Sequence, residues 1–200
     1  MTEAVPDATR PFTVLFVCTG NICRSALAEQ LLRARLEAAG TTVDGRPIHV
    51  ASAGTGVVSG LEMPTEVVEQ SRRFGADPTG HVPTALTRDA VAEADLILTA
   101  TRDHRSDVAR LLPRASRVTF TVPQFARLVA ETGGDVADLH TLVADAAAER
   151  GLVPPPEHAD DDDIEDPYRR STETYERVGE RIRVLVDGIA TRMEAAGDHR

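Results

Sequence analysis

The strongest constraint on the fold lies near the start of the chain, in residues 13–32. Residues 14–17 form an uninterrupted apolar run that ends at Cys18, as is typical of a buried strand. From Ser25 onward the apolar residues recur at helical spacing. This stretch therefore predicts a strand, a tight loop and a helix, with a cysteine at the carboxyl end of the strand.

The loop at residues 18–25 has the composition of an anion-binding site. It ends at a helix N-terminus, where free backbone N–H groups and the helix dipole attract negative charge. Gly20 and Asn21 tolerate the positive φ angles that such a cradle needs. Arg24 adds a planar fork for two phosphate oxygens, and the same field favours a nucleophilic thiolate at Cys18. The alternative is a buried structural cysteine beside a turn.

Length and composition indicate one sizeable α/β domain, because 200 residues can bury a real core. The net charge of −10 argues against nonspecific binding to nucleic acid or anionic membranes. No apolar run approaches the length of a membrane span, and the N-terminus lacks an apolar signal segment. We expect a flexible tail at residues 1–10 and a single domain over residues 11–200.

Cys18 and Cys23 are the only two cysteines, and both lie in the same loop. This is no disulfide framework, so the sequence predicts a reducing, cytoplasmic location. No histidine pair or Cys/His cluster has the spacing of metal ligands, and we expect no metal site.

Strand-like and helical segments alternate along the rest of the chain. We expect further strands at residues 48–51, 95–99 and 117–122. We expect helices at residues 25–39, 64–74, 87–94, 103–112, 123–132 and 136–150, and from about residue 171 onward. This alternation predicts a parallel sheet with helices on both faces and a ligand at the carboxyl ends of its strands, where Cys18 lies.

The sequence CTGNICRS at residues 18–25, here named the phosphate loop, resembles that of the low-molecular-weight protein tyrosine phosphatases. The resemblance covers nearly the whole chain and is strongest at residues 13–32, 51–56, 95–99 and 163–182. It implies an α/β fold, a single-domain four-stranded parallel sheet of order 2-1-3-4. It also implies a cysteine-dependent phosphomonoesterase that hydrolyses phosphotyrosine on proteins or peptides through a phosphocysteine, without a cofactor.

The resemblance also implies the roles of individual residues. Cys18 would be the nucleophile, Arg24 the phosphoryl clamp, Ser25 the hydroxyl that stabilises the thiolate, and Asp166 the acid of an Asp-Pro-Tyr loop. The phosphate-binding and loop-support residues would be Thr19, Gly20, Asn21, Ile22, Cys23, Ser52 and His81. Tyr168 would lie at the substrate rim, and a Cys18–Cys23 disulfide would form under peroxide.

Several of these residues have simpler interpretations. Ser25 is also a plausible helix cap, and His81 could be an ordinary surface-loop residue. Asp163 is either a companion acid to Asp166 or one member of a solvated acidic run at residues 160–163.

Three other functions remain open at this stage: a protein-arginine phosphatase, a thiol-linked arsenate reductase and a non-catalytic phosphate-binding module. Arginine phosphatases carry Thr where this chain has Ile22, and an arsenate reductase needs further cysteines outside the loop. The sequence departs from the family at Ala26, at Arg169 and Arg170, and after Gly56, where it has Val57, Val58 and Leu61 in place of an aromatic residue. The segment at residues 125–160 is longer than is usual in the family. The oligomeric state stays open.

Overall fold

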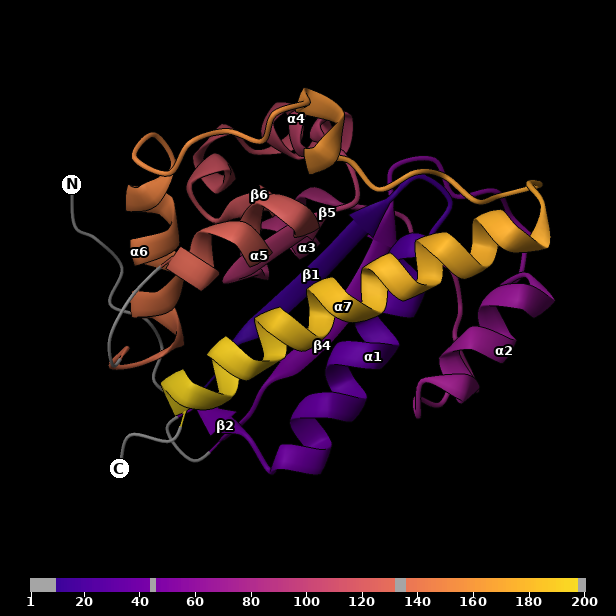
Figure 1. Ribbon diagram of the computed structural model, residues 1–200, viewed down its shortest axis with the longest axis horizontal. Coiled ribbons are helices and arrows are strands. Elements are labelled where there is room, and N and C mark those ends of the chain that lie inside the picture. Colours follow the sequence, from indigo (N-terminus) through magenta and orange to yellow (C-terminus); the bar gives the residue numbers. More distant parts are fainter. Residues whose placement is uncertain (1–9, 44–45, 132–135, 198–200) are drawn as a thin grey trace.

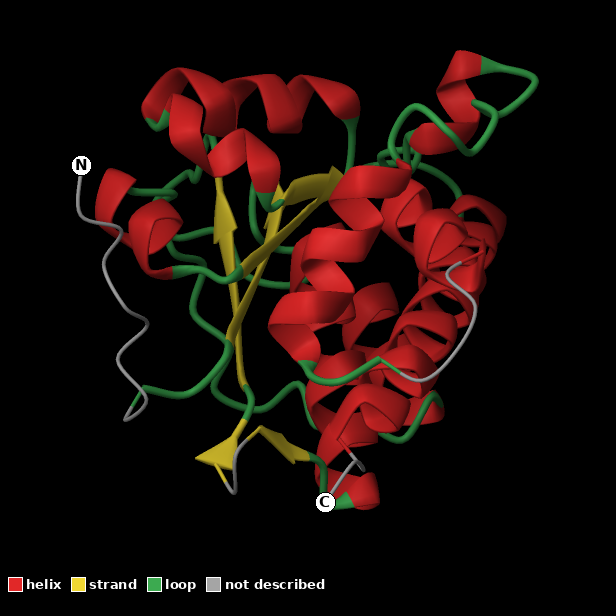
Figure 2. Cartoon of the chain, turned by 90° about the vertical axis from the view of Figure 1, so that its left-hand side faces the viewer, coloured by secondary structure: helices red, strands yellow, loops and turns green. Residues whose placement is uncertain are grey.

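The computed structural model describes residues 10–43, 46–131 and 136–197. Its centre is a four-stranded sheet in which every neighbouring pair is parallel (Figure 2). The strands stand in the order β4-β1-β5-β6. Their bounds are β1 Thr13–Cys18, β4 His49–Gly54, β5 Leu96–Thr99 and β6 Thr119–Thr121. Numbered along the chain, this is the predicted order 2-1-3-4, and the fold prediction is confirmed.

Helices connect the strands and cover both faces of the sheet. They are α1 Arg24–Ala39, α2 Thr65–Arg73, α3 Arg88–Glu93, α4 Arg102–Leu111, α5 Val122–Glu131, α6 Leu139–Glu149 and α7 Thr172–Gly197. The described chain also has two short 3₁₀ helices, η1 Pro113–Arg117 and η2 Ala159–Asp162. Two short antiparallel strands, β2 Thr42–Val43 and β3 Arg46–Pro47, form a small hairpin.

The sheet divides the hydrophobic core into two layers, because alternate side chains of a strand point to opposite faces. Val14 and Phe16 of β1 pack in the larger layer, which includes residues of α1, α5, α6 and α7. Leu15 and Val17 pack in the smaller layer, under α3 and α4. The long α7 crosses the larger face and lies beside α1 (Figure 1).

Local sequence signals account for four of the helix ends. Gly40 ends α1 in the left-handed conformation, with φ 64°. The side chains of Thr87, Thr101 and Asp138 accept hydrogen bonds from the third residue beyond each, and so cap α3, α4 and α6. The predicted boundaries of these helices hold to within a few residues.

Other boundaries differ from the prediction. Residues 117–122 were expected to form one strand, but β6 keeps only three residues between η1 and α5. The β2–β3 hairpin was not expected, because two-residue strands carry no recognisable period. In α7 the fully buried Val186 faces the core, while its neighbour Leu185 is only partly buried.

The expected N-terminal tail at residues 1–10 lies outside the described residues except for Arg10. Arg10, the first described residue, forms an ion pair with Asp95. Within the described ranges, none of the helices is long and apolar enough to cross a membrane.

Candidate active site

The phosphate loop begins at the carboxyl end of β1, between β4 and β5, as predicted. Cys18 pairs with Gly54 of β4, and the loop then turns into the first residue of α1, Arg24. A Cβ atom at Gly54 would lie 2.5 Å from the carbonyl oxygen of Thr19, so glycine is needed where β4 passes the loop.

The thiol of Cys18 lies at the base of the loop and is almost fully buried. Its Sγ shares a hydrogen bond of 2.9 Å with Oγ of Ser25. Ser25 Oγ also accepts a hydrogen bond of 3.0 Å from the amide of Asn21, which leaves the Ser25 hydroxyl proton free to point at the sulfur. The helix-cap interpretation of Ser25 is wrong, because the N-cap position of α1 is Cys23.

Asn21 is held in the left-handed conformation, with φ 55°, by contacts on three sides. Its side chain donates to Ser52 at 2.7 Å and accepts from the backbone N–H of Thr84 at 2.8 Å. Nε2 of His81 lies 2.7 Å from its carbonyl oxygen. The predicted contacts with Ser52 and His81 are therefore present, and His81 is not a free surface residue. The positive φ expected at Gly20 is not found, although Gly20 lines the cleft over the loop.

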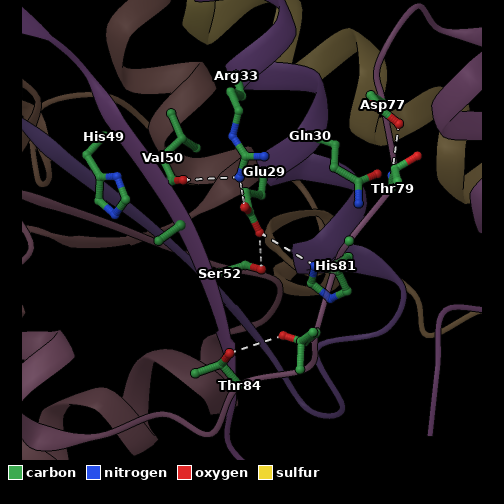
Figure 3. Close-up of a pocket in the computed structure, with 13 residues that line it drawn as sticks. Glu29, Gln30, Arg33, His49, Val50, Ser52, Asp77, Thr79, His81 and Thr84 are labelled. Carbon is green, nitrogen blue, oxygen red and sulfur yellow. Dashed lines mark hydrogen bonds and ion pairs between the residues drawn. The ribbon is translucent and has the colours of Figure 1, made fainter.

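Glu29, which the sequence analysis missed, lies behind this network, in the second turn of α1. Its carboxylate accepts a hydrogen bond from Ser52, pairs with Arg33 and lies 3.9 Å from Nδ1 of His81 (Figure 3). A cavity of about 340 Å³ opens beside these residues. A signal was available, because Glu29 and Gln30 are polar residues between the apolar residues 26–28 and 31–32 of α1.

The guanidinium of Arg24 is buried and lies between the phosphate loop and residues 163–171, here named the acid loop, which carry Asp166. Nη1 donates to the carbonyl oxygen of Ile164 at 3.0 Å, and Nη2 lies 2.8 Å from Oδ2 of Asp166. Its Nε is buried and makes no hydrogen bond within the described protein. Since a buried donor without a partner is costly, Nε suits an oxyanion bound in the loop.

A cleft of about 180 Å³ lies over the loop and reaches from Cys18 to Asp166. Hydrocarbon dominates its walls, which include Ile22, Val58, Leu61 and the ring of Tyr168. The side chain of Ile22 is 4% exposed, so it packs into the protein. The same side chain also forms part of the cleft wall. The cleft therefore combines an anion-binding base with walls that suit a flat apolar group.

Cys23 also lines the cleft, but it is buried and packs in the larger core layer. Burial raises the pKa of its thiol to about 12, and the neighbouring Cys18 and Asp166 act in the same direction. Cys23 is therefore a neutral thiol at physiological pH. Both cysteines are free.

His104 of α4 is a second residue that the sequence analysis missed. Its Nε2 lies 2.9 Å from Oγ1 of Thr19, and its Nδ1 lies 2.7 Å from Oγ1 of Thr101. Burial lowers the pKa of His104, and the nearby Arg24 lowers it further. A neutral imidazole thus anchors the first residue after the nucleophile.

Asp163 is neither free nor solvated, because Arg102 at the start of α4 grips its carboxylate. The interpretation of residues 160–163 as a solvated run is also wrong for Asp162, whose side chain is 14% exposed and pairs with Arg127. It holds for Asp160, whose side chain pairs with Arg102 but is 93% exposed. Across the described ranges, no group of three or more histidine, cysteine or acidic residues could hold a metal ion.

Comparison with known proteins agrees with this geometry. Residues 13–143 match the family model "Low molecular weight phosphotyrosine protein phosphatase". The chain is 28% identical over 185 residues to the "Probable low molecular weight protein-tyrosine-phosphatase EpsP" of Ralstonia nicotianae, covering 92% of this chain and 98% of that protein. It is also 32% identical over 128 residues to the protein-arginine-phosphatase of Geobacillus stearothermophilus, covering 64% and 78%.

Among solved structures, a low molecular weight protein tyrosine phosphatase from T. tengcongensis superposes with a TM-score of 0.65 at 26% identity. That superposition covers 89% of this chain and 97% of the other. The family model spans more than half of the chain and includes the whole phosphate loop. The chain therefore belongs to the low molecular weight phosphotyrosine protein phosphatase family.

Proposed function

We propose that this protein hydrolyses phosphotyrosine in proteins or peptides, with Cys18 as the nucleophile. The observation that carries the proposal is the convergence of Cys18 Sγ, the Ser25 hydroxyl and the buried Arg24 guanidinium at the base of one cleft. Family membership makes the chain a cysteine-dependent phosphatase, and the arrangement supports assigning the steps to individual residues.

In the first step the Cys18 thiolate attacks phosphorus, in line with the tyrosine oxygen. Arg24 and the backbone N–H groups of the phosphate loop stabilise the equatorial oxygens as their charge develops. Asp166, in its protonated form, transfers a proton to the leaving phenolic oxygen. The products are tyrosine and a phosphocysteine.

In the second step Asp166, now a carboxylate, accepts a proton from the water that attacks the phosphocysteine. The sulfur–phosphorus bond breaks and inorganic phosphate is released. The Ser25 hydroxyl stabilises the departing thiolate, because its proton is not used by Asn21. No metal or organic cofactor has a role in this scheme.

The walls of the cleft favour an aryl phosphate over phosphoarginine. Ile22 offers only hydrocarbon to a guanidinium, which would lose hydrogen bonds on entry, whereas a phenyl ring loses none. Tyr168 provides a further ring surface. A protein-arginine phosphatase is the second candidate, because two relatives with that name are each 32% identical to parts of this chain.

The other candidates are weaker. A thiol-linked arsenate reductase would need further cysteines, and the sequence has only Cys18 and Cys23. A non-catalytic phosphate-binding module would have no need of Asp166 beside the loop. We further propose that residues 11–200 form the phosphatase domain and that the protein acts in the reducing cytoplasm, where a thiolate nucleophile persists.

The test is turnover of p-nitrophenyl phosphate and of a phosphotyrosine peptide in the presence of a metal chelator. Wild type should turn over both, and Cys18→Ser should turn over neither while still binding inorganic phosphate. Ser25→Ala is the companion variant. In this variant the second step should be slowed, so that the phosphocysteine accumulates. Activity that requires added metal, or that survives Cys18→Ser, would refute the proposal.

A further inference from the structure

The acid loop at residues 163–171 has no helix or strand of its own, although it carries Asp166. The Asp166 side chain is half exposed, with its ion pair to Arg24 as its contact across the cleft. A proton donor must be held within a fraction of an ångström of the leaving oxygen to be effective. Some other part of the protein must therefore fix this loop.

The strongest attachment of the loop is to Arg102, the first residue of α4. The backbone N–H of Arg102 donates to Oδ1 of Asp163 at 2.8 Å, and its Nη2 donates to Oδ2 at 2.7 Å. Nε lies 3.2 and 3.1 Å from the two oxygens. Nη2 also reaches Asp160, at 2.7 Å. Figure 1 shows η2 and the start of the acid loop lying beside α4.

The interaction between Arg102 and Asp163 is electrostatically favourable for two reasons. Arg102 presents a planar fork to a carboxylate, the geometry in which charged hydrogen bonds are strongest. Asp163 also lies at the N-terminus of α4, where the helix dipole favours an anion. Although partial burial opposes ionisation of Asp163, the hydrogen bonds from Arg102 outweigh it and the pKa of Asp163 is lowered.

The next residue carries the attachment to the phosphate loop. Ile164 is buried, its N–H donates to the carbonyl oxygen of Ala100 at 2.8 Å, and its own carbonyl oxygen accepts from Arg24 at 3.0 Å. Only Glu165 separates Ile164 from Asp166, and Pro167 restricts the backbone of Asp166. A shift at Asp163 would therefore be transmitted over three residues to the acid.

We propose that Arg102 is a positioning residue for the reaction: by gripping Asp163, it holds the carboxyl of Asp166 over the phosphate loop. The inference rests on the proposed role of Asp166 as the acid. It extends that role to a residue 64 positions away in sequence that contacts neither the cleft nor the substrate.

The chain offers a matched control in Arg127 of α5. Its Nη2 lies 2.9 Å from both oxygens of Asp162, so it ties the same acidic run to a different helix. The Arg127–Asp162 pair is the more buried one, with side chains 28% and 14% exposed against 38% and 25% for Arg102 and Asp163. A purely structural effect of losing an ion pair should therefore be at least as large at Arg127.

The experiment compares kcat/KM, which reports phosphoryl transfer to Cys18 and not the shared second step, for two substrates. The leaving group of phenyl phosphate needs a proton, and that of p-nitrophenyl phosphate needs it less. Arg102→Met should lower kcat/KM for phenyl phosphate roughly tenfold or more, and several-fold less for p-nitrophenyl phosphate, since general acids contribute about 10²–10⁴. Arg102→Lys should recover part of the loss. Arg127→Met should leave the ratio of the two rates unchanged.

Asp163→Asn keeps the size of the side chain and should reproduce the effect of Arg102→Met, which guards against a variant that fails to fold. In an Asp166→Asn background, Arg102→Met should cause no further change in the ratio. The proposal is wrong if Arg102→Met slows both substrates equally, if Arg127→Met matches it, or if its effect multiplies fully with Asp166→Asn. If Asp166→Asn itself leaves the ratio unchanged, the proposed role of Asp166 fails instead.

Discussion

Arg24 and Asp166 form an ion pair across the mouth of the cleft, with Nη2 of one 2.8 Å from Oδ2 of the other. The pair joins the residue proposed to clamp the phosphoryl group to the residue proposed to protonate the leaving group. An oxyanion that enters the phosphate loop therefore competes with Asp166 for the same guanidinium. Binding of substrate should release the Asp166 carboxyl for its task.

Removing the charge of Asp166 should tighten the binding of inorganic phosphate while it slows turnover. Asp166→Asn leaves Arg24 without a competing carboxylate and removes repulsion of the anion. The inhibition constant for phosphate should fall by about two- to fivefold, since a half-exposed ion pair contributes roughly 0.2–1 kcal/mol. Glu165→Gln, which removes a neighbouring carboxylate that pairs with Arg177, is the control and should change little. Weaker phosphate binding in Asp166→Asn would contradict this account.

His104 should make stability depend on pH in the mildly acidic range. Burial, assisted by Arg24, holds its folded-state pKa below the ordinary value of 6.5. As pH falls below that value the unfolded chain binds the proton first, so this contribution is present at higher pH and is lost as pH falls through the folded-state pKa. When the pH is lowered from 7.5 to 5.5, the melting temperature of His104→Gln should decrease less than that of wild type. His49→Gln, at an exposed histidine, should behave as wild type does.

Cys23 should protect Cys18 from irreversible oxidation, but slowly at neutral pH. Peroxide converts the Cys18 thiolate to a sulfenic acid, and attack by the Cys23 thiolate forms the disulfide with release of water. Because the pKa of Cys23 is raised to about 12, few Cys23 side chains are thiolates at pH 7.

The rate of disulfide formation should therefore rise as pH increases from 7 to 9, which mass spectrometry of alkylated samples can follow. Activity should return with reductant in wild type and not in Cys23→Ala. Equal recovery in the two proteins would show that Cys23 has no protective role.

Ile22 should select against phosphoarginine. It lines the cleft from a buried position, so Ile22→Thr would place a hydroxyl where a guanidinium could bind it. The ratio of kcat/KM for phosphotyrosine over phosphoarginine should exceed one in wild type and fall in Ile22→Thr, by about tenfold if one hydrogen bond is gained. Ile22→Val, which trims the same wall without a hydroxyl, should not shift the ratio. An unchanged ratio in Ile22→Thr would place selectivity elsewhere on the rim.

The parts of the site that the sequence predicted are those whose signals are local. Cys18, Arg24 and Ser25 lie within eight residues, and an apolar run followed by helical spacing is enough to place them at a strand end and a helix start. The contacts of Asn21 with Ser52 and His81 span 31 and 60 residues, and these were expected only because the whole chain resembles a known family.

Residues that act across the fold without such a resemblance were missed. Arg102 contacts Asp163, 61 residues away in sequence, and His104 contacts Thr19, 85 residues away. No neighbouring residue in the sequence distinguishes Arg102 from the other arginines, of which there are 22 in all, or His104 from the other histidines, of which there are six in all. The partners of Asp162 and Asp163 in the acidic run were missed for the same reason, because the arginines that pair with them come from α5 and α4. Charge patterns in sequence do not reveal partners that only the tertiary fold brings close.

The central claim is that the phosphoryl group passes through the sulfur of Cys18. Rapid acid quenching during turnover of a phosphotyrosine peptide, followed by mass spectrometry of the proteolysed protein, measures this directly. The account predicts one phosphoryl group on Cys18, formed within the first turnover and enriched in Ser25→Ala, where its breakdown is slowed. A phosphoryl group on another residue, or full turnover with no phosphocysteine in either protein, would contradict it.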